Sequence, residues 1–317
     1  MTRLLLFICL FSISTITSAA DSYIKTYGNP AHQALIFLHG GPGGSSLDFE
    51  LSTAMPLSQL GLFIIVYDRK GEGRSYEDNV TYGFQQTNQE LIALFEQYNL
   101  KKAVLLGHSF GGIVAVKFAE KYPEKVSHLI LTGTPFSLQR SFSTILHNAQ
   151  ASARESKDSL LQKQVEQTQV ADKHSLQYSA GCFALAMQTG AYTVKQPTEE
   201  ATRHYTALMQ HAELINYTQS LKELQYAPMF QPVSGFWKNE QYTGIEIVDA
   251  VQQIRKNSIA VFGIYGQEDG LFDHEHFEHI TLLLGKENFK LVPRASHGIF
   301  MDQQEIFIQS LLEWIRK

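Results

Sequence analysis

Cysteine and charge are both scarce in this sequence. Only two of the 317 residues are cysteines, Cys9 and Cys182, and charged side chains make up 18% of the chain. Cys9 falls in a segment that we expect to be removed, so the remaining chain can form no internal disulfide. Cys182 lies in an apolar stretch, which favours burial of its thiol. This composition fits neither a disulfide scaffold nor a disordered, highly charged chain.

Basic runs and long apolar runs are missing as well. The chain has 26 Lys and Arg against 31 Asp and Glu, and its formal net charge is -5. A mildly acidic protein without a basic run is not expected to bind nucleic acid or an anionic membrane surface. No apolar run reaches the roughly 20 residues that a membrane-spanning helix needs. We therefore expect a globular protein without stable membrane insertion, and its oligomeric state stays open.

The first 20 residues have the three parts of a signal peptide. Arg3 supplies a positive start, residues 4–16 are apolar, and Ser18, Ala19 and Ala20 are small residues at the expected cleavage site. The alternative is a buried N-terminal strand or helix. We expect cleavage before Asp21 and an exported protein, either periplasmic or secreted.

Short apolar runs alternate with helical patterns along most of the remaining chain. The runs are apolar almost throughout, which is typical of strands covered on both faces in a parallel sheet. They span 34–38, 62–67, 103–106, 128–132 and 259–265, and helical patterns span 88–98, 113–122 and 305–315. The alternation predicts an α/β fold with a mostly parallel sheet flanked by helices.

The alternation stops between about residues 136 and 256. This stretch is rich in Gln, Ser and Thr, has helical patches and lacks convincing buried strands. Strand patterns lie on both sides of it, so we interpret it as a helical cap inserted into one domain. The predicted organisation is a signal peptide at 1–20, a core formed by 21–135 and 257–317, and a cap at 136–256.

The strongest chemical motif is Gly-His-Ser-Phe-Gly-Gly at 107–112. It follows a predicted strand directly and opens a predicted helix, which is the setting of a nucleophile elbow. Such a turn holds its serine in a strained conformation with the hydroxyl exposed. The pattern therefore predicts Ser109 as a nucleophile.

A serine hydroxyl needs a general base that is itself oriented by a carboxylate. Asp269 and His297 each follow a predicted strand, at 259–265 and 289–292, and come in the order that this fold requires. Glu268 is a rival for the acid, and His108 is better explained as a packed neighbour than as the base. The acidic and histidine-rich segment 273–279 lacks a His-Glu-x-x-His motif, so we favour a solvated helix over a metal site.

Acyl transfer also needs hydrogen-bond donors for the oxyanion. The loop His-Gly-Gly-Pro-Gly-Gly at 39–44 follows the first predicted strand, and its glycines allow a close backbone approach. We expect the two donors to be the backbone N–H groups of Gly41 and Phe110. The alternative for the loop is a simple tight turn.

These motifs together make the sequence recognisable. It resembles the α/β-hydrolase superfamily and, within it, the proline iminopeptidase-like serine peptidases, in five motifs. They are H-G-G-P-G at 39–43, D-x-x-G-x-G-R-S at 68–75, G-H-S-F-G-G at 107–112, G-x-x-D at 266–269 and S-H-G at 296–298. The resemblance implies the same nucleophile, acid, base and oxyanion donors, and a structural turn at 68–75.

The sequence departs from the pattern of these peptidases in three places. Arg69 and Lys70 replace the usual Gln-Arg, and Phe110 replaces a frequent Trp or Tyr. The aminopeptidases hold the substrate's amino group with acidic side chains, but Gly270 follows Asp269 where one such carboxylate is expected. Glu240 and Glu213 in the cap are the remaining candidates for binding the substrate amine.

We therefore expect an exported serine hydrolase without a cofactor or metal, acting on a small molecule or short peptide. The first hypothesis is a proline iminopeptidase-like aminopeptidase that releases N-terminal residues. The alternative is a carboxylesterase or lactonase for apolar acyl groups. A non-catalytic ligand-binding protein on the same fold is a third, remote hypothesis.

Overall fold

The computed structural model describes residues 22–317, so the predicted signal peptide lies outside the described residues. One seven-stranded sheet forms the centre, in the order β1-β3-β2-β4-β5-β6-β7. Its strands are β1 Ile24–Tyr27, β2 Gln33–Leu38, β3 Leu62–Tyr67, β4 Ala103–His108, β5 Val126–Thr132, β6 Ala260–Gly266 and β7 Phe289–Val292. Every neighbouring pair is parallel except β1 with β3. The predicted α/β fold is confirmed.

Each predicted apolar run forms a strand, and the sequence missed only β1. The four residues of β1 are half-buried, because this strand lies at the sheet edge. An edge strand needs no continuous apolar run, which explains why the pattern did not reveal it.

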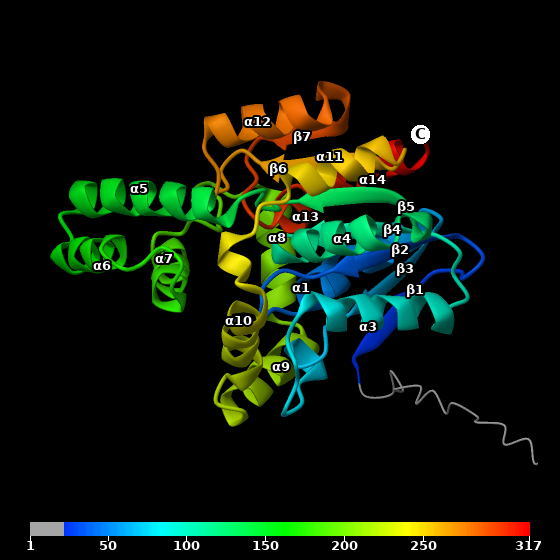
Figure 1. The fold of residues 1–317 in the computed structure, drawn as a ribbon, viewed down its shortest axis with the longest axis horizontal. Helices are drawn as coiled ribbons and strands as arrows, with labels where there is room; N and C mark the ends of the chain where they lie inside the picture. The colour runs from blue at the N-terminus through cyan, green and yellow to red at the C-terminus, as the bar shows by residue number, and fades with distance from the viewer. Residues whose placement is uncertain (1–21) are drawn as a thin grey trace, which may run out of the picture.

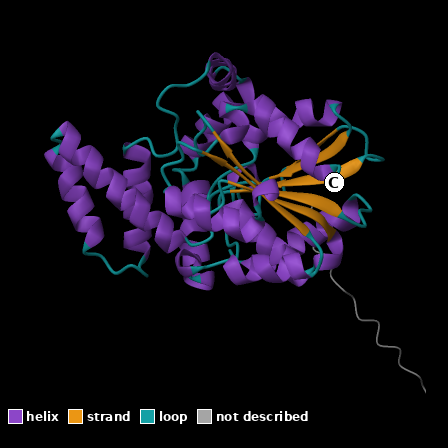
Figure 2. Cartoon of the chain, turned by 90° about the horizontal axis from the view of Figure 1, so that it is seen from above, coloured by secondary structure: helices purple, strands orange, loops and turns teal. Residues whose placement is uncertain are grey.

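Helices cover both faces of the sheet (Figures 1 and 2). One face packs against α3 Phe84–Gln97, α4 Phe110–Lys121, α11 Val248–Lys256 and α12 His274–Leu284. The other face packs against α1 Leu47–Phe49, α2 Met55–Gln59, α13 Ile299–Asp302 and α14 Gln304–Ile315. A π-helical turn, Glu50–Ala54, joins α1 to α2. Each of the two hydrophobic cores therefore lies between the sheet and one helical layer, and the first also takes in buried side chains of residues 138–186 and Phe236.

The remaining helices occupy most of the stretch predicted as a cap. They are α5 Leu138–Ser156, α6 Ser159–Gln169, α7 Leu176–Gln188, α8 Glu199–Met209, α9 Ala212–Glu223 and α10 Ala227–Glu240. Figure 1 shows α5, α6 and α7 extending to one side of the sheet, while α9 and α10 lie below it in that view. The next helix, α11, packs against α4 and β6. Cys182 is fully buried in α7, as predicted, and burial raises the pKa of its thiol to about 12.

Among residues 22–317, no helix combines the length and apolarity that crossing a bilayer demands.

Candidate active site

Ser109 lies in a sharp turn between β4 and α4. Its backbone has φ 54° and ψ −124°, a conformation that residues other than glycine rarely adopt. Such a conformation costs roughly 1–3 kcal/mol and persists only where the surroundings enforce it. Two backbone hydrogen bonds do so here, from Ser109 N to Thr132 O and from Gly112 N to Ser109 O, both at 2.9 Å. The structure thus gives Ser109 the geometry of a nucleophile elbow.

The glycines of this turn are required by close packing. A Cβ atom on Gly111 would lie 2.1 Å from the carbonyl oxygen of Leu38, in β2. One on Gly112 would lie 1.9 Å from Oγ1 of Thr134. These glycines therefore let the first turn of α4 approach the sheet, and α4 begins three residues before the helical pattern in the sequence.

Asp269 and His297 form a hydrogen-bonded pair. Asp269 follows β6 and is 1% exposed, and His297 follows β7 and is 8% exposed. The ring Nδ1 of His297 lies 2.7 Å from Oδ2 of Asp269. A carboxylate oxygen only accepts, so Nδ1 carries the proton and Nε2 is left as the basic nitrogen. The two residues predicted as acid and base are therefore brought together, in the arrangement that orients an imidazole.

His108, the residue before Ser109, links this pair to the serine turn. His108 Nε2 lies 3.0 Å from the backbone oxygen of His297, and the two rings are 4.8 Å apart between centroids. Burial and the nearby imidazole of His297 lower the pKa of His108 to about 3, so His108 is neutral and donates through Nε2. On the other side, a Cβ atom on Gly40 would lie 3.2 Å from Cβ of Ser109. The serine, histidine and glycine loops thus meet at the carboxyl edge of the sheet.

The 39–44 loop contacts the cap as well as the serine turn. Gly41 has φ 125° and Gly43 has φ 86°, both in the region that favours glycine. A Cβ atom on Gly43 would lie 2.1 Å from the carbonyl oxygen of Met229 in α10. Gly41 follows the residue that touches Ser109, and Phe110 is the first residue of α4, where backbone N–H groups have no intrahelical acceptor. The predicted oxyanion donors therefore belong to two segments that flank Ser109.

A buried ion pair holds the 39–44 loop. Arg69 is 1% exposed, and its Nε donates to Oε1 of Glu72 at 2.7 Å. Its other nitrogens donate to the backbone oxygens of His39, at 2.6 Å, and Gly40, at 2.8 Å. The second oxygen of Glu72 accepts from Gly43 N at 2.6 Å. Burial would lower the pKa of Arg69, but the charge and hydrogen bonds of Glu72 outweigh it and raise the pKa.

The sequence marked Arg69 only as a departure from the usual pattern. In the structure, Arg69 and Glu72 form hydrogen bonds with the backbone of the loop that contains Gly41, a predicted oxyanion donor. The role depends on a contact across about 30 residues of chain, and no local pattern in the sequence predicts it.

A second buried ionic cluster fixes the 68–75 turn. Asp68 is fully buried and accepts hydrogen bonds from Arg74 Nε, at 2.8 Å, and Ser46 N, at 2.7 Å. Arg74 also donates to Glu50 at 2.7 Å. Burial favours a higher pKa for Asp68, but the hydrogen bonds and charge of Arg74 dominate and lower it. Asp68 is therefore ionised, and it ties the turn to the start of α1.

The carboxylates predicted to bind an amine have other partners. Glu240 accepts a 2.7 Å hydrogen bond from Phe84 N, at the start of α3. Glu213 lies 3.3 Å from Lys25 Nζ, and both side chains are about two-fifths exposed. Gly270 packs against Ala191, and a Cβ atom at this position would lie 2.7 Å from Ala191 Cβ. The structure therefore leaves no space for a side chain where the aminopeptidases are expected to carry a carboxylate.

Asp302 is a residue at the site that sequence analysis missed. It is fully buried, and its Oδ2 accepts from Ser296 N at 2.7 Å and Ser296 Oγ at 2.6 Å. Its Oδ1 accepts from the hydroxyl of Tyr205, in α8, at 3.0 Å. Burial raises the pKa of Asp302, and the hydrogen bonds from Ser296 oppose that change. Asp302 thus ties the loop that carries His297 to the cap.

The side chains considered as alternative catalytic or metal-binding residues have other contacts in the structure. Glu268 accepts from Lys195 N at 3.0 Å, whereas Asp269 makes the contact with His297. Asp273 caps α12 and accepts from His276 N at 2.9 Å. Within the described part of the chain, no group of three or more His, Cys, Asp or Glu side chains is placed to hold a metal.

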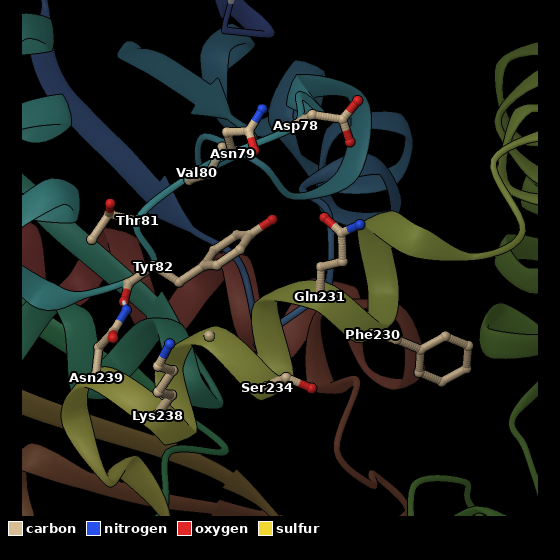
Figure 3. A pocket seen from close by; sticks show the side chains of 11 residues that line it. Asp78, Asn79, Val80, Thr81, Tyr82, Phe230, Gln231, Ser234, Lys238 and Asn239 are labelled. Carbon is tan, nitrogen blue, oxygen red and sulfur yellow. Dashed lines mark hydrogen bonds between the residues drawn. The ribbon is translucent and has the colours of Figure 1, made fainter.

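Two cavities are lined in part by residues of the cap. One of about 300 Å³ is lined by the loop, by His108 and by residues of α9 and α10. The other, of about 670 Å³, lies between residues 78–82 and α10, where Figure 3 shows Tyr82, Gln231 and Lys238 around it. Ser109, Asp269 and His297 line neither cavity. The smaller cavity lies nearer to them, because its wall includes Gly40, which lies close to Ser109, and His108, which contacts His297.

Curated relatives include two proline iminopeptidases. The enzyme of Saccharolobus solfataricus is 37% identical over 125 residues, which cover 37% of this chain and 40% of the relative. The chain thus matches only about two-fifths of the length of that relative. The enzyme of Clostridioides difficile is 23% identical over 290 residues, which cover 89% of both chains.

Solved structures share the same fold. A proline iminopeptidase-related protein from Thermus thermophilus has a TM-score of 0.63 and 18% identity, over 93% of both chains. An esterase from Exiguobacterium antarcticum has a TM-score of 0.59 and 17% identity, over 93% of this chain and 96% of the other. The model of the α/β hydrolase fold family matches residues 33–304. The chain therefore belongs to the α/β-hydrolase family, and within it resembles the proline iminopeptidases.

Proposed function

We propose that the protein is a serine hydrolase that works through an acyl-enzyme. The observation that carries the proposal is the 2.7 Å contact of His297 with Asp269, beside a serine in a strained turn. Ser109 attacks a substrate carbonyl while Nε2 of His297 takes its proton. Asp269 keeps the imidazole in the tautomer that exposes Nε2 and stabilises its charged form.

The backbone N–H groups of Gly41 and Phe110 bind the oxyanion that forms in this step. Such donors lower the barrier because they point at the developing charge before the reaction begins. His297 then returns its proton to the leaving group, and a water molecule activated by His297 hydrolyses the acyl-enzyme. The ion pair of Arg69 and Glu72 supports this role, since it fixes the loop on which Gly41 lies.

For the substrate, we propose short peptides from which one N-terminal residue is released at a time. The support is the H-G-G-P-G motif at 39–43 and the similarity to proline iminopeptidases over 89% of both chains in one relative. A second candidate is an ester or lactone with an apolar acyl group. The contacts of Glu240 with Phe84 and of Glu213 with Lys25 favour it, because neither carboxylate is left free for an amine.

Comparison of two substrates tests the proposal. We would measure kcat/KM of the purified protein on a prolyl-arylamide and on p-nitrophenyl butyrate, with Ser109→Ala as the blank. An aminopeptidase turns over the prolyl-arylamide and loses that activity when the substrate is N-acetylated. An esterase turns over only the butyrate. Turnover of either substrate that persists in Ser109→Ala would contradict Ser109 as the nucleophile, and no turnover at all would favour a binding protein.

We also propose export, on the signal-peptide pattern of residues 1–20. The test is expression of the full chain in a bacterial host, followed by cell fractionation and N-terminal sequencing. Export predicts a product in the periplasm or medium that begins at Asp21. A product that keeps Met1 and stays in the cytoplasm contradicts it.

A further inference from the structure

The 300 Å³ cavity beside the serine turn is enclosed mainly by apolar side chains. Phe37, Phe49 and Phe300 lie on one side of it, and all three are at most 4% exposed. They form one aromatic cluster, in which the stacked rings of Phe37 and Phe49 are 3.9 Å apart and Phe300 meets Phe49 at 5.6 Å. The cap closes the other side with Tyr217 and Met229. These aromatic and apolar side chains offer no charge that would pair with a carboxylate.

One carboxylate nevertheless lines the cavity, that of Asp48 in α1. Its side chain is exposed and lines the cavity, whereas its neighbours Leu47 and Phe49 are buried. Among the hydrogen bonds and ion pairs of residues 22–317, none involves its carboxylate, and only its backbone oxygen accepts, from Ser52. Asp48 thus differs from Asp68 and Glu50 nearby, whose carboxylates are bound by Arg74.

The surrounding protein raises the pKa of Asp48, and the charge of Arg74 only partly offsets this effect of burial. Arg74 does not provide a partner, since its guanidinium binds Asp68 and Glu50. The carboxylate is open to solvent in the cavity but has no protein cation bound to it, so an opposite charge that enters the cavity is attracted to it. A cationic ligand would supply that charge.

We propose that Asp48 binds the cationic group of a small organic ammonium ligand in this cavity. The apolar body of the ligand packs on the aromatic cluster, and its ammonium group donates to the carboxylate. The ring of Tyr217 in the wall adds a surface that attracts cations. The volume lies at the lower end of the roughly 300–1,000 Å³ found for ligand sites, so the ligand is about the size of one amino-acid residue.

The position of the cavity links this site to the proposed chemistry. Gly40 and His108 line the cavity, and both contact the segments that carry Ser109 and His297. A substrate whose carbonyl carbon sits at Ser109 can therefore extend its acyl part into the cavity. In this form the inference rests on the proposed function, and Asp48 then selects acyl groups that carry an amine. It takes the role that the sequence suggested for Glu240 and Glu213.

A binding experiment tests the site without turnover. We would titrate the full-length Ser109→Ala protein at pH 7 with prolinamide and with cyclopentanecarboxamide, which has the same shape but no ammonium group. The deciding quantity is the ratio of the two affinities. We expect prolinamide to bind roughly ten- to a hundredfold more tightly, as charge-assisted hydrogen bonds in such sites suggest.

Substitutions at Asp48 in the same background sharpen the test. Asp48→Asn should bring the ratio close to one, and Asp48→Glu should keep prolinamide the tighter ligand. Asp78→Asn is the matched control, because Asp78 is an exposed carboxylate on the wall of the other cavity (Figure 3). A ratio near one in the parent protein overturns the proposal. So does a ratio that Asp48→Asn leaves unchanged.

A turnover experiment separates this inference from the proposed function. With Ser109 in place, Asp48→Asn should lower kcat/KM for a prolyl-arylamide at least tenfold relative to p-nitrophenyl butyrate. If the parent turns over neither substrate, the proposed function fails, and the affinity ratio alone decides on Asp48. If the parent turns over the prolyl-arylamide and Asp48→Asn leaves the preference unchanged, the hydrolase stands and the role of Asp48 is overturned.

Discussion

On the core side of the candidate site, Arg69 and Glu72 are almost completely buried and bind the backbone of the 39–44 loop. On the cap side, helices α8, α9 and α10 carry exposed apolar side chains. Met209 is 68%, Ile215 55% and Phe230 64% exposed. The core side is thus held by short, charge-assisted hydrogen bonds, whereas these three cap helices leave large apolar side chains exposed.

This difference matches the tasks that we propose for the two sides. Oxyanion donors are effective only when they are oriented before charge develops, which requires a rigid backbone. Binding of different substrates tolerates more adjustment, and flexible apolar surfaces can repack around a ligand. We therefore propose that the core side supplies catalysis and the amine contact of Asp48, whereas the cap side shapes the apolar part of the substrate cavity with Tyr217 and Met229.

The largest effect is expected from Asp269→Asn. This substitution keeps the shape of the side chain but lets it donate to Nδ1 of His297, which selects the wrong tautomer. We expect kcat to fall by about 10⁴-fold, as the same change does in serine hydrolases with a triad. The measurement is kcat on the better of the two test substrates, with circular dichroism to verify the fold. A decrease below tenfold would mean that another residue orients the base.

Arg69→Met tests the rigidity of the core side. It leaves the charge of Glu72 buried without a partner, which costs about 3–5 kcal/mol in the free energy of unfolding. Urea denaturation measures this loss, and the double variant Arg69→Met/Glu72→Gln should recover part of it.

Arg140→Met is the matched substitution in the cap. Arg140 pairs with Glu275 at 3.2 Å, and the two side chains are 35% and 83% exposed. Exposed ion pairs contribute about 0–1 kcal/mol, so we expect a small loss. Equal losses at Arg69 and Arg140 would contradict the difference between the two sides.

Glu240→Ala tests the connection of the cap to α3. The carboxylate accepts a hydrogen bond from Phe84 N in the first turn of α3. It therefore satisfies a free N–H group at the N-terminus of that helix from a distant segment of the chain. We expect a loss of about 1 kcal/mol in the free energy of unfolding, as for other helix caps. Phe230→Ser provides the control, because its exposed ring should contribute little. An unchanged free energy of unfolding in Glu240→Ala would mean that this hydrogen bond does not stabilise the contact between α10 and α3.

An effect that depends on pH concerns Glu90 in α3, which accepts from Gln86 Nε2 at 2.8 Å. Burial raises the pKa of Glu90 to about 7 from its ordinary value of 4.5. Between about pH 4.5 and 7, the Glu90 carboxyl is therefore protonated in the folded protein and ionised in the unfolded chain. The resulting stabilisation is complete below about pH 4.5 and disappears as the pH rises through 7.

Glu90→Gln should remove this dependence on pH. Denaturation in urea at pH 5, 6, 7 and 8 would show the parent losing stability relative to the variant as the pH rises. A difference that stays constant over this range would contradict the raised pKa of Glu90.

Much of the fold and the core of the candidate site follow from patterns close together in the chain. Continuous apolar runs predicted the buried strands, since strands covered on both faces need apolar side chains throughout. Ser109, Asp269 and His297 were found because each follows a strand, and parallel strands end at the same edge of the sheet. The edge strand β1 lacks such a run and was missed.

Residues that act across long stretches of chain could not be predicted in this way. Asp302 reaches back to Ser296 and outward to Tyr205, and Glu240 reaches the start of α3. Both are acidic residues whose local surroundings in the sequence do not reveal a partner. Their roles depend on how the cap packs on the core.

The sequence alone determined the family, the parallel sheet and the order of the proposed catalytic residues, because these depend on periodicity and on short motifs at strand ends. Only the tertiary structure decided which carboxylates near the candidate site are bound and that, within residues 22–317, the carboxylate of Asp48 has no hydrogen-bond or ion-pair partner. It gave Glu240 and Glu213 to Phe84 and Lys25, and it left Asp48 beside the cavity. The reason is physical: a carboxylate's role depends on the charges and donors within a few ångströms, and folding brings those from distant parts of the chain.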